Sequence, residues 1–240
     1  MVREQDSAVM VYVPAGDFLM GSPAGQGDEE EQPQHTVYLD AFWIDRTEVT
    51  NAQYNQCVAS GVCTGGNAAP EWAKYPVTDI SWNQAQAYCS WAESRLPTEA
   101  EWEKAARGTD GRMYPWGEGI DCNRVRYDGE GCSGSVVLPV GSVPAGASPY
   151  GALDMAGNVA EWVTDWWDPN YYKISPRENP PGPERSGGLS VDVRVVRGSN
   201  PYAFEPNVVN SPDLLRTAWR YWYFPESGSP SIGFRCAQSP

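Results

Sequence analysis

Two acidic residues and an asparagine lie close together in the stretch DMAGNVAEWV, residues 154–163. Asp154 is followed three places on by Gly157-Asn158, and Glu161 comes three places after that asparagine. Neither the 3.6-residue period of a helix nor the alternation of a strand explains this spacing. An acid, an amide and a second acid are residue types found in active sites. The stretch is therefore a candidate functional site, a signature of the fold, or both.

Six cysteines form a second chemical feature of the chain. Two pairs would each close a short loop, and the remaining two cysteines form a long-range pair: Cys57 with Cys63, Cys122 with Cys132, and Cys89 with Cys236. An even number that divides in this way favours three disulfides and an oxidising compartment, extracellular or periplasmic. The alternative is six reduced cysteines, some of them packed as small apolar side chains. A zinc site is not expected, because the chain has no CxxC motif and His35 is its single histidine.

The overall composition narrows the classes of partner. The formal net charge of −14 argues against duplex nucleic acid or an anionic membrane surface. A divalent cation fits this charge balance better. No apolar run approaches eighteen residues, so no membrane insertion is expected, and the N-terminal residues lack the pattern of a signal peptide. Without an internal repeat or a linker between self-sufficient patterns, residues 1–240 are expected to form one domain.

Several segments carry clear signals for the elements that must position these residues. Thr50 is expected to cap a helix over 51–60, and Ser81 a helix that begins at 82. Thr98 is expected to cap a helix that begins at 99 and ends at Gly108. Glu101 completes a capping-box pattern with Thr98. Alternating apolar residues predict strands in MVYVPAGDFLMGS and HTVYLDAFWIDRTEVT. Residues 109–240 are expected to be mostly loop, with short strands near 136–143, 193–198 and 232–237.

These segments, taken in order, resemble the formylglycine-generating enzyme family, also called the sulfatase-modifying-factor domain. The matching stretches are VPAGDFLMGS, FWIDRTEVTNAQY, PVTDISWNQAQAYCSWAESRLPTEAEWEKAARG, YPWG, GALDMAGNVAEWVTDWW, RVVRGS and IGFRCA, and they cover nearly the whole chain. The resemblance implies an α+β, C-type-lectin-like fold that is loop-rich and has little regular secondary structure. It also implies that Cys89 pairs with Cys236.

The resemblance also implies what an enzyme of this family would need. Catalytic members oxidise a substrate cysteine to formylglycine with two cysteines that bind copper(I) shortly after an RGGS-like turn, because a soft cation prefers thiolate sulfur. The matching stretch here, residues 197–220, contains no cysteine, so no copper and no catalytic residue are expected. The family's structural cysteine pair aligns with Ala106 and Thr217, so both of its members are replaced together.

A binding function is the leading hypothesis, with its surface in residues 198–231. Aromatic side chains interleaved with Asn, Ser and Arg are typical of recognition surfaces. The candidate contact residues for a protein or small ligand are Asn200, Tyr202, Phe204, Asn207, Asn210, Trp219, Arg220, Tyr221, Trp222, Tyr223 and Phe224. The alternative for several of these rings is a place in the core. The same composition is compatible with a variable protein of a diversity-generating retroelement and with an ordinary family member. Formylglycine generation, or another enzyme activity on this fold, is the runner-up.

The resemblance assigns a structural calcium ion to the stretch DMAGNVAEW. Asp154 and Glu161 would supply carboxylate oxygens, and Gly157 and Val159 would supply carbonyl oxygens, the ligands that Ca²⁺ prefers. The alternative is that the two acidic residues only cap turns and pair with nearby arginines.

Overall fold

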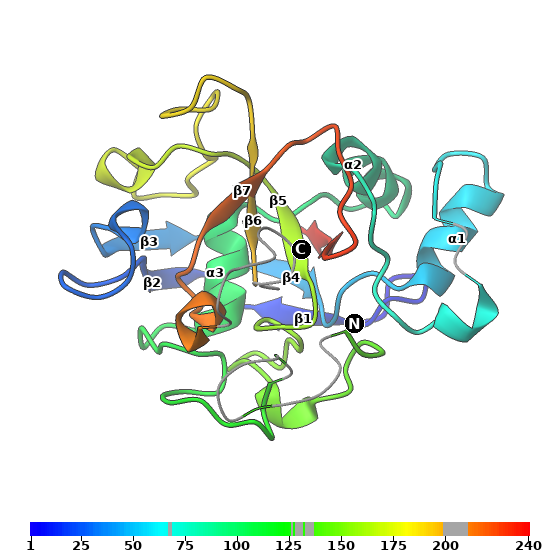
Figure 1. Ribbon diagram of the computed structural model, residues 1–240, viewed down its shortest axis with the longest axis horizontal. Coiled ribbons are helices and arrows are strands. Elements are labelled where there is room, and N and C mark those ends of the chain that lie inside the picture. Colours follow the sequence, from blue (N-terminus) through cyan, green and yellow to red (C-terminus); the bar gives the residue numbers. More distant parts are fainter. Residues whose placement is uncertain (67–68, 126, 128–131, 133–136, 199–210) are drawn as a thin grey trace.

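The computed structural model describes residues 1–240 except 67–68, 126, 128–131, 133–136 and 199–210. Five of the candidate contact residues, Asn200, Tyr202, Phe204, Asn207 and Asn210, lie outside the described residues. Short helices and strands are joined by long loops (Figure 1). No helix within the described ranges is long and apolar enough to span a membrane.

Three helices begin where the sequence predicts them. α1 covers Asn51–Ala59, α2 covers Trp82–Trp91 and α3 covers Glu99–Arg107. Each begins with a capping box. The side chain of Thr50, Ser81 or Thr98 accepts the backbone N–H of the residue three places on, and the side chain of that residue accepts the backbone N–H of the cap residue. α3 ends at Gly108, whose φ of 71° is a conformation that glycine adopts at little cost.

The strands form three small sheets. β1 (Met10–Val13), β4 (Phe42–Asp45) and β9 (Ala237–Gln238) form one, and β2 (Gly16–Met20) pairs with β3 (His35–Leu39). The third has the order β7-β6-β5-β8, from Tyr221–Tyr223, Arg194–Arg197, Ala160–Trp166 and Ile232–Phe234. β5 lies antiparallel to β6 and parallel to β8, so residues 160–166 are at the centre of this sheet.

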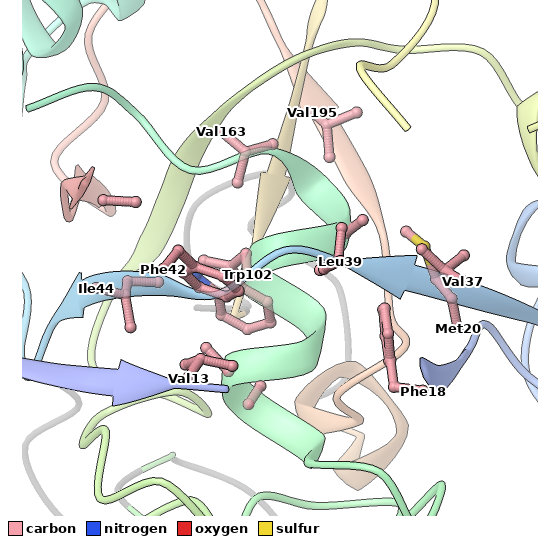
Figure 2. Packing of buried hydrophobic residues seen from close by; sticks show 14 of the residues in the cluster. Val13, Phe18, Met20, Val37, Leu39, Phe42, Ile44, Trp102, Val163 and Val195 are labelled. Carbon is pink, nitrogen blue, oxygen red and sulfur yellow. The ribbon is translucent and has the colours of Figure 1, made fainter. Parts of the chain in front are cut away.

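The four-stranded sheet separates two apolar clusters. One joins α3 to the strands β1–β6 and includes Trp102, Val163 and Val195, with Trp102 lying among Val13, Phe42 and Leu39 (Figure 2). The other joins α1 and α2 to the opposite face of the sheet and includes Trp162 and Val196. Neighbouring residues of β5 and β6 thus point to opposite clusters, as the two-residue period of a strand requires.

Three disulfides are present and confirm the pairing expected from the sequence. Cys57 bonds Cys63, Cys89 bonds Cys236 and Cys122 bonds Cys132, with Cα–Cα distances of 5.3, 5.6 and 5.4 Å. The Cys89–Cys236 bond links α2 to the segment before β9 and lies in the second apolar cluster. Since no cysteine is free, no thiol of this chain is available as a nucleophile or a metal ligand.

Some strand predictions were wrong. MVYVPAGDFLMGS forms two strands instead of one, because Pro14 has no N–H for a ladder and interrupts the pairing. The strand expected near 136–143 is absent from the described residues 137–143. The backbone N–H groups of Leu138 and Gly141 donate instead to the side chains of Asn158 and Asp154. The central strand β5 was not predicted, because its residues are buried on both faces and do not alternate.

Candidate binding site

The described part of the C-terminal segment is held against α3 by buried ion pairs. Arg197, at the end of β6, donates to Glu99 at 2.9 Å and to Glu103 at 2.7 Å. Arg220 donates to both carboxylate oxygens of Glu99, at 2.7 and 2.8 Å. Arg197 also donates to the carbonyl oxygen of Thr217 at 2.6 Å. These contacts fix both flanks of residues 199–210 to one helix.

We call this network of buried arginine and glutamate side chains the frame. Its arginines hold the C-terminal segment in place. Arg220 is 1% exposed, and besides Glu99 its guanidinium donates to the carbonyl oxygens of Glu30 and Asp168. Trp219 is also buried. Neither side chain is therefore available to contact a ligand in this structure. The acidic loop of residues 25–34 contributes to the same frame, because Glu31 is fully buried and pairs with Arg216.

The aromatic residues that follow form a row of ring contacts along the edge strand β7. Trp219 stacks on Tyr221 and Tyr221 on Trp222, with centroid separations of 5.5 and 5.6 Å. Trp222 and Tyr223 each contact Phe224 edge-on, at 5.8 and 6.0 Å. Tyr221, Trp222 and Tyr223 are half-buried, and Phe224 is 44% exposed. We call residues 221–224 the aromatic edge. Its rings present partly exposed, rigid contact area, which is the property expected of a recognition surface.

An arginine on the neighbouring strand extends the aromatic character of this face. Arg194 is paired in register with Tyr223, and its guanidinium lies over the rings of Trp82 and Trp166, at 3.8 and 3.4 Å from their centroids. Burial lowers the pKa of Arg194 to about 10. This stack could not be predicted from the sequence, because Trp82 and Arg194 are 112 positions apart along the chain.

A cavity of about 460 Å³ opens beside the frame, under residues 213–218. Its described lining comes from residues 19–34, from residues 107–118 after α3, and from Asp213, Arg216, Thr217 and Ala218. The lining includes carboxylates, guanidiniums and hydroxyls but no cysteine or histidine. The hydroxyl of Thr217 donates to the carbonyl oxygens of Arg112 and Met113, and that of Ser22 donates to Glu31. These groups can bind polar ligands.

The stretch DMAGNVAEW forms a tight turn that leads into β5. Asp154, Gly157 and Asn158 all have positive φ, of 58°, 82° and 60°, so the backbone curls through this turn. Asp154 accepts the N–H of Gly141 at 2.6 Å. The amide of Asn158 donates to Glu48 at 2.8 Å and accepts the N–H of Leu138 at 2.9 Å. The turn therefore joins three distant segments and supports the loop-rich half of the chain.

Three carboxylates and one guanidinium are buried around this turn. Glu161 accepts two hydrogen bonds from Arg235, each 2.6 Å, and a third from Trp102 at 2.8 Å. Burial raises the pKa of Glu48 well above its ordinary value, and the carboxylates of Asp154 and Glu161 raise it further. Burial also raises the pKa of Asp154. Arg235 thus balances only part of the negative charge, and Glu48 was not singled out from the sequence.

The oxygen-rich surroundings of this turn fit a hard cation in part. Glu48 Oε2 is buried and has no hydrogen-bond partner in the described structure. The carboxylate of Asp154 is close enough for its charge to raise the pKa of Glu48. Glu161, in contrast, already uses both oxygens for Arg235. Among the described residues, no three acidic, histidine or cysteine side chains converge on one point. A cation here would have to rely on Asp154, Glu48 and backbone carbonyl oxygens, such as those of Gly157 and Val159.

Ala106 and Thr217, the two positions that the resemblance pairs, are both in the interior. Both are fully buried, Ala106 one position before Arg107 in the last turn of α3 and Thr217 between the arginines of the frame. Glu103, one turn earlier in α3, is linked through Arg197 to the carbonyl oxygen of Thr217. The hydroxyl of Thr217 donates to the carbonyl oxygens of Arg112 and Met113, in the segment that follows α3.

The fold and the frame together define a loop-rich α+β domain of the C-type-lectin-like class. A family model described as "Sulfatase-modifying factor enzyme 1-like domain" matches residues 2–240. The chain belongs to this family. The expected fold class is thereby confirmed.

Individual relatives carry several different names. The formylglycine-generating enzyme of Streptomyces coelicolor is 35% identical over 98% of this chain and 90% of its own length. A serine/threonine-protein kinase, pkn1, of Chlamydia caviae is 37% identical over 95% of this chain, which spans only 38% of that relative. A mouse protein named inactive C-alpha-formylglycine-generating enzyme 2 is 30% identical over 98% of this chain and 87% of its own length.

Solved structures agree with this assignment. PvdO from Pseudomonas aeruginosa superposes with a TM-score of 0.79 at 26% identity, covering 100% of this chain and 97% of that one. Treponema denticola variable protein 1 superposes with a TM-score of 0.75 at 26% identity, covering 96% and 95%. The proteins that this chain resembles are thus named as enzymes, as an inactive enzyme and as a variable protein.

Proposed function

We propose that this chain is a non-catalytic binding member of its family, and that its ligand or protein partner contacts the exposed part of residues 198–231. One observation carries the proposal: all six cysteines are held in disulfides, so the stretch that matches the family's copper site has no thiolate to offer. The similarity to Treponema denticola variable protein 1 supports the same function.

The geometry of the segment is the second support. Two buried arginines hold its described flanks to α3, while the aromatic edge remains partly exposed. Fixing the flanks lowers the entropy that ordering a binding surface would otherwise cost. A rigid frame with a partly exposed aromatic rim suits recognition, and it would tolerate sequence change between the flanks, as diversification by a retroelement would require.

Formylglycine generation is the alternative, and it is tested directly. The protein, with its three disulfides intact, is incubated with copper(I), oxygen and a peptide that contains the CxPxR sequence, and aldehyde formation is followed by mass spectrometry. The formylglycine-generating enzyme of Streptomyces coelicolor serves as the positive control. We expect no aldehyde above the protein-free blank. Robust turnover by this chain would overturn the proposal.

Binding through the aromatic edge is tested on defined arrays of glycans and peptides. Wild type is compared with Phe224→Ser and Trp222→Ser, and with Ile174→Ser as a control, because Ile174 is 75% exposed and lies outside the segment. We expect at least one array signal that both edge variants lose and the control keeps. Melting curves confirm that the variants are folded. Signals unaffected by either edge variant would place recognition elsewhere.

We further propose that the turn of residues 154–161 binds a structural calcium ion. The unpartnered oxygen of Glu48 and the excess of buried carboxylate over guanidinium support it. Asp154 and Glu48 would supply side-chain oxygens, and the curled backbone would supply the carbonyl oxygens of Gly157 and Val159. The ion would offset buried negative charge and stabilise the turn. Three disulfides also suit an extracellular or periplasmic location.

A further inference from the structure

The cavity beside the frame has a chemical character of its own. It opens between the loop that follows β2, the segment that follows α3, and residues 213–218, the first three of which belong to η6 (Pro212–Leu215, orange in Figure 1). None of its described lining residues belongs to the aromatic edge. Its volume of about 460 Å³ lies in the range of sites that hold a small ligand or a long side chain. We call it the acidic cavity, because carboxylates predominate among its charged lining residues.

Carboxylates outnumber guanidiniums in the lining. The four acidic residues are Asp28, Asp110, Glu118 and Asp213, against Arg107 and Arg216. Both arginines are already paired with buried glutamates behind the wall, Arg107 with Glu103 at 2.6 Å and Arg216 with Glu31. Glu103 also pairs with Arg197, and Arg112 pairs with Asp110 at 2.7 Å, so the positive charge is only partly offset from behind. The described lining still carries more carboxylates than guanidiniums.

The carboxylates lie where an incoming cation could reach them. The side chains of Asp28, Asp110 and Asp213 are 55%, 59% and 76% exposed. Asp28 and Asp213 approach Arg216 only at 3.7 and 4.0 Å, since its short contact goes to Glu31. A hydrogen bond with Arg112 lowers the pKa of Asp110, which keeps that carboxylate ionised at neutral pH. Negative potential in a concave site attracts cations more strongly than the same charges on a flat surface.

The rest of the lining suits an aliphatic stem. Leu19, Pro23, Met113 and Ala218 provide apolar wall. Arg107 is 3% exposed, and its Nε has no hydrogen-bond partner among the described residues, although its other nitrogens are satisfied by Gly21, Glu103 and Gly111. Because this nitrogen is itself buried, it does not face the cavity, and the apolar residues are what the rest of the lining offers to a bound molecule.

We propose that the acidic cavity binds an arginine or lysine side chain of a partner polypeptide. The cationic head would meet Asp213, Asp28 and Glu118, and its methylene stem would lie along Leu19 and Met113. The inference rests on the proposed binding function and names the chemistry of the partner. It also adds a contact region apart from the aromatic edge.

The test uses a defined probe, the peptide acetyl-Gly-Arg-Gly-amide, titrated calorimetrically into the full chain at low ionic strength. The matched probe replaces arginine by citrulline, which keeps the shape and removes the charge. We expect the arginine peptide to bind about tenfold or more tightly than the citrulline peptide, and added salt to weaken only the former. Equal binding of the two peptides, or no binding of either, would overturn the inference.

Variants assign the binding to the cavity. Asp213→Asn with Glu118→Gln removes two rim charges, and Glu71→Gln with Glu184→Gln removes two exposed charges outside the lining. We expect the first pair to weaken the arginine peptide about tenfold and the second pair to leave it within about twofold. An equal loss in both pairs would indicate only the overall charge and would overturn the site. If array binding through Phe224 persists while the cavity shows no arginine selectivity, only this inference fails. If both are lost, the proposed function fails with it.

Discussion

Buried acidic residues in this chain differ in whether a salt bridge compensates their charge, and Asp165 shows how a missing salt bridge affects the pKa. Its side chain is buried and accepts the N–H of Glu99 at 2.7 Å and the hydroxyl of Thr164 at 3.0 Å, but it forms no salt bridge in the described structure. Burial, together with the carboxylate of Glu99, raises the pKa of Asp165 from 3.8 to about 7. The folded protein therefore holds this proton more tightly than the unfolded chain.

The sign of the pH dependence follows from that raised pKa. The stability that Asp165 contributes is fully present below about pH 4 and is lost as pH rises towards 7, by at most about 1.4 kcal/mol per pH unit. We expect Asp165→Asn to remove this slope. Urea unfolding at several pH values between 4 and 7 measures the difference between wild type and variant, with Glu184→Gln as the exposed control. A difference that does not change with pH would contradict the prediction.

Individual site residues could be predicted from the sequence only where a motif marks them. Asp154 and Glu161 belong to a specific motif, and the aromatic edge is visible as the run YWYF. Glu48 and Glu31 carry no such mark, because their importance comes from distant partners, Asn158 and Arg216. Arg220 was expected to contact a ligand. The local sequence pattern cannot show that its guanidinium binds Glu99, because Glu99 is 121 positions away.

At the scale of elements, α3 is the support for the C-terminal segment. Its two inward-facing glutamates, Glu99 and Glu103, bind Arg197 and Arg220, and its aromatic residue Trp102 donates to Glu161. The capping boxes that begin the three helices were predictable, since they depend on residues three positions apart. β5 was not predictable, since a strand buried on both faces loses its alternation.

The absent covalent link between α3 and the segment can be restored as a test. Ala106→Cys with Thr217→Cys puts cysteines at two buried positions that the resemblance pairs. Under oxidising conditions we expect them to cross-link, and closing a loop of about a hundred residues should stabilise the protein by roughly 2–4 kcal/mol. Mass spectrometry under non-reducing conditions detects the bond, and Ala106→Ser with Thr217→Ser controls for lost packing and hydroxyl contacts. Two persistently free thiols would show that the positions do not face each other.

At the scale of the whole molecule, the balance of buried charge sets the response to metal. The chain carries a net charge of −14, and the environment of Glu48 combines three carboxylates with one guanidinium. Burial, followed by the carboxylates of Asp154 and Glu161, raises the pKa of Glu48, and burial raises the pKa of Asp154, so both groups favour holding a proton. A bound calcium ion would replace that proton and stabilise the folded state, because it binds there and not to the unfolded chain.

Removal of calcium is therefore expected to destabilise the protein. Free calcium at about a hundred times the Kd of the site stabilises the folded state by roughly 2.7 kcal/mol. A chelator should therefore lower the melting temperature by about 5–10 °C. Glu48→Gln should have the opposite effect on the metal-free protein, raising its melting temperature by removing a repulsive charge while keeping the contact of Oε1 with Asn158. The same variant should shrink the shift caused by the chelator, whereas Glu184→Gln should leave it unchanged. Elemental analysis must confirm that the metal is gone. An identical melting temperature before and after complete removal would show that the turn is held by its hydrogen bonds and Arg235 alone.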